Sequence, residues 1–109
     1  MEGKIPVFTT RRAFFSFAYP DIWCIDPDQQ PELVEIKMKE SPKLVIIDSE
    51  IFHPIFIKTY EEIFDIIETQ KLDTEIVIYG HSSNEATGCR VVNNEKSLKK
   101  LIDEKKNED

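Results

Sequence analysis

Asp48 is the residue in this chain whose position best suits chemistry. It ends the run Lys-Leu-Val-Ile-Ile-Asp at 43–48, in which four consecutive apolar residues are typical of a strand buried on both faces. The carboxyl end of such a strand is where open α/β sheets bind ligands and carry out reactions. A lone carboxylate does not define an activity, so its neighbours in the fold have to be considered.

Four other residues are expected near Asp48, because they follow strands that should lie beside it. Thr9 and Thr10 come after a first short strand, and Gly80 and His81 come after a fourth. The two threonine hydroxyls could donate hydrogen bonds to the carboxylate, which favours a structural role for the acid. His81 could form a pH-sensitive pair with it, although a histidine that faces solvent is more common in a loop.

The elements that must position these residues alternate along the chain. Short apolar segments predict strands at 5–8, 22–25, 43–48, 76–79 and 89–92. Helices are expected from Thr9 or Thr10 to Pro20, from Pro31 to Ser41, around 60–67 with a 3.6-residue period, and after Asn93 or Asn94 as the cap. The alternation indicates a parallel sheet with helices on both faces.

The fold that we predict is α/β, a five-stranded parallel sheet of order 2-1-3-4-5, as in flavodoxin-like proteins. The fourth helix should be short or missing, because residues 81–88 are small and polar. Cys24 and Cys89 would lie on opposite edges, beyond the roughly 7 Å limit for a disulfide. We therefore expect two reduced thiols.

The composition limits the classes of function. A chain of 109 residues predicts one domain, 1–109, and the net charge of −7 argues against nucleic acid or anionic membranes as partners. No apolar stretch approaches the roughly 20 residues that span a bilayer, and no secretion signal is present at the start, so a cytoplasmic location is expected. No motif indicates a cofactor or a metal site.

An unusually apolar segment follows Asp48 and is expected to form a loop at 51–57. Phe52, Ile55 and Phe56 would then lie at the carboxyl end of the sheet. They form either an exposed patch that contacts a partner or a second copy, or a cover that folds over the site. Phe15, in the cluster Phe-Phe-Ser-Phe at 14–17, is expected to be exposed or buried in a dimer.

Taken in order, these residues resemble a response regulator receiver domain over nearly the whole length. The most similar part is 30–51, a helix followed by Pro-Lys-Leu-Val-Ile-Ile-Asp-Ser-Glu-Ile. The resemblance implies that Asp48 matches the aspartate that accepts a phosphoryl group in that family. The fold and the interval from Asp48 to the end of the fourth strand agree with it.

The other residues of the family's site do not match. Receivers have adjacent acidic residues, which hold Mg²⁺, where this chain has Thr9 and Thr10. They have Ser or Thr at the position of Gly80, and a Lys where this chain has Asn at 93–94. Mg²⁺ needs charged oxygen ligands, and phosphorylation of a carboxylate needs a cation, so we expect Asp48 to remain unphosphorylated.

These observations favour a pseudo-receiver, a protein-interaction module without catalytic activity that acts in signalling or regulation. Its partner would be another protein or a second copy of the chain. One alternative is a residual receiver that is still phosphorylated on Asp48. Another is a degenerate rhodanese-like domain, in which Gly80 replaces the catalytic cysteine after the strand 76–79.

Overall fold

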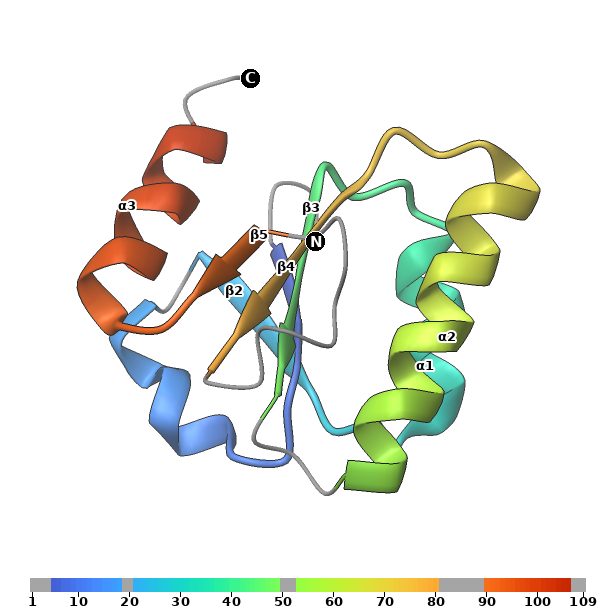
Figure 1. The fold of residues 1–109 in the computed structure, drawn as a ribbon, viewed down its shortest axis with the longest axis horizontal. Helices are drawn as coiled ribbons and strands as arrows, with labels where there is room; N and C mark the ends of the chain where they lie inside the picture. The colour runs from blue at the N-terminus through green and yellow to red at the C-terminus, as the bar shows by residue number, and fades with distance from the viewer. Residues whose placement is uncertain (1–4, 19–20, 50–52, 81–89, 107–109) are drawn as a thin grey trace.

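The computed structural model describes residues 5–18, 21–49, 53–80 and 90–106. Within these ranges, five strands alternate with one 3₁₀ helix and three α-helices (Figure 1). They are β1 (Ile5–Phe8), η1 (Arg12–Ala18), β2 (Ile22–Ile25), α1 (Pro31–Met38), β3 (Leu44–Asp48), α2 (His53–Gln70), β4 (Glu75–Tyr79), β5 (Arg90–Val92) and α3 (Glu95–Lys106). The predicted alternation of strands and helices is confirmed.

The strands form a parallel sheet of order β2-β1-β3-β4-β5, as predicted. β3 lies between β1 and β4, and its Asp48 is the Cα partner of Tyr79 on β4. On its other side, Ile47 pairs with Phe8, the last residue of β1. The residue after β1 therefore lies level with Asp48 at the carboxyl edge of the sheet.

The side chains of the strands alternate between two cores, one on each face of the sheet. In β3, Ile46 belongs to the core on the side of η1 and α3, whereas Ile47 belongs to the core on the side of α1 and α2. Figure 1 shows η1 and α3 on the left of the sheet and α1 and α2 on the right. Asp48 follows the alternation of Leu44 and Ile46, so its side chain faces η1.

The first helix differs from the predicted one because it has the 3₁₀ form. With three residues per turn, Phe15 and Ala18 fall on one face and are buried together. Phe14, by contrast, is 38% exposed, and Ala13 is also exposed. The expectation that Phe15 is exposed or lies at a dimer contact is therefore wrong, since Phe15 is 0% exposed within one chain.

The apolar segment after β3 is helical from His53 onward, so the predicted loop at 51–57 is wrong in its larger part. Phe56, Thr59 and Ile63 are buried at spacings of three and four residues, which is the period of an α-helix and not of a loop. Pro54 is tolerated because it occupies the first turn. Ile51 and Phe52 lie outside the described residues.

The prediction that Asn93 or Asn94 caps the last helix is confirmed. Asn94 caps α3, since its Oδ1 accepts a hydrogen bond of 2.8 Å from the backbone N–H of Ser97.

Cys24 is buried on the edge strand β2, and β5 forms the opposite edge, but Cys89 lies outside the described residues. The expected short or missing fourth helix also falls there, at 81–89. In the described part of the chain, no helix is both long and apolar enough to cross a bilayer.

Candidate functional site at the carboxyl end of β3

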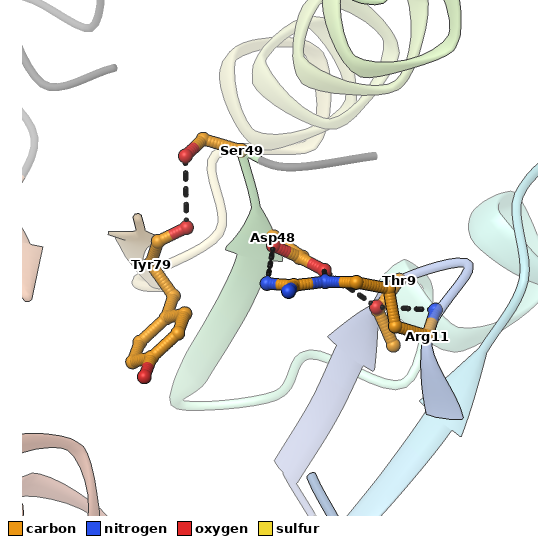
Figure 2. A network of polar contacts seen from close by, with 5 residues as sticks. All are labelled: Thr9, Arg11, Asp48, Ser49 and Tyr79. Atoms are coloured by element: carbon orange, nitrogen blue, oxygen red, sulfur yellow. Dashed lines mark hydrogen bonds and ion pairs between the residues drawn. The ribbon is translucent and has the colours of Figure 1, made fainter. Parts of the chain in front are cut away.

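Asp48 is 0% exposed and forms an ion pair with Arg11 (Figure 2). Nε of Arg11 donates to Oδ2 of Asp48 at 2.7 Å, and Nη2 donates to Oδ1 at 2.9 Å. Both carboxylate oxygens thus accept from one planar guanidinium, a bidentate geometry that is among the strongest hydrogen-bonded pairings in proteins. The Arg11 side chain is 34% exposed, so the pair lies at the border between core and solvent.

The hydroxyl of Thr9 holds both partners of this pair. Its Oγ1 donates to Oδ2 of Asp48 at 2.7 Å and accepts a hydrogen bond of 2.9 Å from the backbone N–H of Arg11. The second contact spans two residues and forms a local turn, which directs the chain after β1 over the end of β3. The expectation that Thr9 donates to Asp48 is confirmed. Thr10, the other expected donor, is exposed at the following bend.

A cluster of aromatic rings lies beside the ion pair, on the side of η1. The guanidinium carbon of Arg11 lies 4.3 Å from the ring centroid of Phe14, within the range of a cation–π interaction. The ring of Phe14 lies 5.7 Å from that of Tyr79, and the ring of Phe15 lies 5.4 Å from the same tyrosine. Phe14 thus covers part of the guanidinium and connects it to the rings of Phe15 and Tyr79, which are buried.

Ser49 joins the ends of β3 and β4. Its backbone N–H donates to the carbonyl oxygen of Tyr79 at 2.8 Å. Its hydroxyl donates to the same oxygen at 2.9 Å (Figure 2). Burial raises the pKa of the Tyr79 phenol above its ordinary value, and the negative charges of Glu95 and Asp48 act in the same direction. Arg11 acts in the opposite direction, so the cation that neutralises Asp48 also affects this tyrosine.

The contacts of Asp48 limit the chemistry that is open to it. A metal ion or a phosphoryl group would have to compete with Arg11 for both carboxylate oxygens, and Oδ2 also accepts from Thr9. Among the described residues, no group of three or more His, Cys, Asp or Glu side chains is arranged to hold a metal ion. In this structure the site is a buried, neutralised acid that ties the β1–η1 connection to β3.

Gly80 closes β4, as predicted, and His81 lies outside the described residues. The backbone N–H of Gly80 donates to the carbonyl of Val92 at 3.0 Å, and its φ of 134° is a value that glycine adopts far more readily than residues with a Cβ. The rhodanese-like alternative needs a sulfur nucleophile after β4. Residues 81–88 contain no cysteine, so that alternative gains no support here.

The side chains predicted to form an interaction surface are mostly part of the core. Phe15 is 0% exposed, which contradicts the expectation for it, and Phe56 is 8% exposed, which rules out the exposed patch among the two alternatives for that residue. Ile55 is half-buried and packs against the core beneath α1 and α2, on the face of the sheet opposite to the Asp48 side chain, so it is not the expected cover of the site. Phe52 lies outside the described residues. Within the described ranges, the large apolar side chains that are exposed are Phe14, Ile36, Ile57 and Phe64.

Arg11 is the functional residue that reasoning from the sequence missed. The residues expected near Asp48 were Thr9, Thr10, Gly80 and His81, and none of them carries a fixed positive charge. A signal was present, because a cation that closely follows β1 should lie beside an acid that ends β3 in the order 2-1-3. A buried carboxylate needs such a partner, and Arg11 is the first cation after β1.

Comparisons of the chain with protein-family models, with curated proteins and with solved structures find no significant match. The fold itself is established by the sheet order and the helices on its two faces. The receiver resemblance remains a hypothesis that depends on the sequence around Asp48. The function is therefore inferred from the geometry of the site.

Proposed function

We propose that this chain is a receiver-like protein-interaction module that works in signalling or regulation without phosphoryl transfer. The observation that carries the proposal is the bidentate contact of Arg11 with both oxygens of Asp48, at 2.7 and 2.9 Å. An internal guanidinium takes the place where a metal-dependent acceptor would need an exchangeable cation. The Arg11–Asp48 pair would then stabilise the fold and would not switch its conformation.

The physical basis is the difference between a guanidinium and a magnesium ion. Mg²⁺ can bind a carboxylate and an incoming phosphate together, because its coordination sphere keeps exchangeable waters. In the observed geometry, the Nε and Nη2 donors of Arg11 point at the carboxylate of Asp48, and the positive charge of Arg11 neutralises that carboxylate. Phosphorylation of Asp48 would break these contacts and would bring a second anion beside Tyr79 and Glu95.

Exposed apolar side chains support the part of the proposal that concerns protein contacts. Ile57 and Phe64 on α2 are 41% and 44% exposed, on the helical layer opposite η1. Single exposed apolar residues are ordinary, but two large ones spaced two turns apart on one helix suit contacts with another protein. The module would thus act through the exposed surface of α2.

The test exposes three proteins to Mg²⁺ with acetyl phosphate and, separately, with beryllofluoride: the wild type, Asp48→Asn and Arg11→Ala. Intact mass reports phosphorylation, and the amide shifts of Asp48 and Ser49 report binding. We expect no mass increase and no saturable shift in the wild type. A phosphoryl adduct on the wild type that disappears in Asp48→Asn would overturn the proposal.

A residual phosphoacceptor is the second candidate, and one observation favours it. The Arg11 side chain is 34% exposed, so it could move from Asp48 and lend its charge to a phosphoryl group, as arginines do in other phosphoryl transfers. The same experiment separates the two candidates. An adduct that needs both Asp48 and Arg11 indicates a residual receiver, whereas an adduct only in Arg11→Ala indicates that Arg11 closes the site.

A further inference from the structure

A second apolar stripe runs along α2, next to the face that packs on the sheet. Ile57, Tyr60, Phe64 and Ile67 recur at spacings of three and four residues, as the a and d positions of two heptads do. We call these four residues the α2 seam. Ile57 and Phe64 are 41% and 44% exposed, whereas Tyr60 and Ile67 are half-buried against the core. Exposed and half-buried side chains therefore alternate along the seam.

The seam is held in place by aromatic contacts. The ring of Tyr60 lies 6.3 Å from that of Phe56 and 6.1 Å from that of Phe64, and all three rings are nearly parallel. Because Phe56 is only 8% exposed, this stack connects the exposed Phe64 to the core. Side chains that are already ordered lose little conformational entropy when a partner binds, which favours affinity.

Acidic residues border the seam on its solvent side. Glu61 and Glu68 each follow an exposed seam residue by four positions, and Asp65 is exposed beside them. The other flank of α2 carries both signs of charge, because Glu62 has Glu35 and Lys58 near it. A partner that approaches the solvent side of the seam therefore meets chiefly carboxylates, which attract basic proteins and repel acidic ones.

We propose that the α2 seam docks a basic amphipathic helix of a partner protein. Apolar side chains of the partner would pack on Ile57 and Phe64, and its Lys or Arg residues would pair with Glu61 and Glu68. Helices commonly recognise each other through such an apolar stripe with charged flanks. This inference deepens the proposed function, on which it rests, because it names the partner of the interaction module.

A second copy of this chain fits the seam less well. If two α2 seams packed against each other, the acidic flanks of both copies would meet, and like charges across an interface oppose association. The seam also lies on the face of the sheet opposite to η1 and the Asp48 site (Figure 1). Binding at the seam can therefore be measured separately from any chemistry at Asp48.

The probe is a synthetic amphipathic peptide about three heptads long, with Leu at the a and d positions and Lys at e and g. Its affinity for the whole chain is measured by titration calorimetry, and amide shifts locate the contact. We expect saturable binding that shifts the amides of α2. Phe64→Ser, and separately the double variant Glu61→Gln/Glu68→Gln, should each weaken the binding by about tenfold. Circular dichroism shows whether each variant stays folded.

Two matched controls remove the effects of net charge and of general hydrophobicity. Asp103→Asn/Glu104→Gln changes the net charge equally, but on the exposed surface of α3, and Ile36→Ser removes an exposed apolar side chain from α1. Both controls should retain the wild-type affinity. A failure to bind would overturn the inference, and so would equal losses in the control and seam variants. A wild-type dimer that Phe64→Ser dissociates would overturn it in favour of a second copy. The phosphorylation test at Asp48 is independent of these outcomes.

Discussion

Asp48 depends on Arg11 because its carboxylate is fully buried, whereas the arginine side chain still reaches solvent. Moving a carboxylate out of water costs several kcal/mol unless a cation and hydrogen bonds compensate for the lost hydration. Here one guanidinium and one threonine hydroxyl supply three short contacts to the two oxygens. The chain thus retains a charged residue at the rim of its core at a modest cost in stability.

Replacing Arg11 by alanine should destabilise the protein by leaving Asp48 buried with fewer partners. We expect the free energy of unfolding to fall by about 1–3 kcal/mol, less than for a fully buried pair because a third of the arginine side chain is exposed. Urea denaturation measures the loss. In an Asp48→Asn background the same change should cost less, and Arg12→Ala, at the exposed neighbour, should cost little. A loss as small as that of Arg12→Ala would contradict the structural role of the pair.

Tyr79 should make stability depend on pH in the alkaline range. Its pKa in the folded protein lies above the ordinary value of 10.0, chiefly because the phenol is buried. Below the ordinary value of 10.0, Tyr79 is neutral in both the folded and the unfolded protein, and its contribution to the free energy of unfolding is fully present. As the pH rises further, the unfolded chain ionises first, so stability is lost until Tyr79 also ionises in the folded state.

The measurement for Tyr79 compares urea denaturation at about pH 9 and about pH 11. Tyr79→Phe keeps the ring and removes the titrating group, so its stability should fall less over this interval than that of the wild type. The absorbance of tyrosinate reports the ionisation directly. An equal fall in both proteins would show that other groups cause the alkaline loss.

At the scale of elements, three segments show how local signals combine with packing. η1 takes the 3₁₀ form, and its period brings Phe15 and Ala18 onto the sheet. α2 begins at His53, which converts an apolar segment into the start of an 18-residue helix. α3 has a polar sequence apart from one apolar stripe, which includes Leu98, Leu101 and Ile102, so its beginning depends on the cap that Asn94 supplies.

Removing the cap of α3 should weaken the protein measurably. Asn94→Ala takes away the acceptor of the N–H of Ser97, and such changes cost about 1 kcal/mol. Thermal and urea denaturation should both show the loss, and Asn94→Asp should restore most of it because its carboxylate can accept the same bond. Asn93→Ala serves as the matched control, since Asn93 precedes the cap and is exposed. Equal effects at both positions would argue against the cap.

For the molecule as a whole, the parallel sheet joins two cores into one cooperative unit. β1, β3 and β4 send alternate side chains to opposite faces, so neither core can be lost without disturbing the strands of the other. Ile46 and Ile47 are adjacent, both 0% exposed, and belong to different cores. They allow the coupling between the two faces to be tested directly.

Ile46→Ala and Ile47→Ala should each lower the free energy of unfolding by about 2–5 kcal/mol. Each variant should still unfold in a single transition, at the same denaturant concentration by far-ultraviolet circular dichroism and by the fluorescence of Trp23, which packs against the α1–α2 core. Ile36→Ala, at an exposed isoleucine, is the control and should cost little. Separate transitions for the two probes would show that the faces unfold independently.

Several parts of this structure follow from the sequence because they depend on short-range patterns. The apolar run that ends in Asp48 has the length of one buried strand, and its alternation with amphipathic helices leaves few arrangements besides the order 2-1-3-4-5. The contact of Thr9 with Asp48 follows from the same order, since neighbouring parallel strands bring their carboxyl ends together. Strand periodicity and connection rules therefore determined the fold and half of the site.

The tertiary structure alone decided that Arg11 and not the adjacent Arg12 pairs with Asp48, and which aromatic residues are exposed. Arg11 and Asp48 are 37 residues apart in the chain, and their pairing depends on the path that the backbone takes after β1. Phe15 and Phe14 are neighbours of the same type, and the 3₁₀ period determines which of them is buried. Such outcomes depend on distances between particular side chains in the packed molecule, which the pattern of residue types along a single chain does not contain.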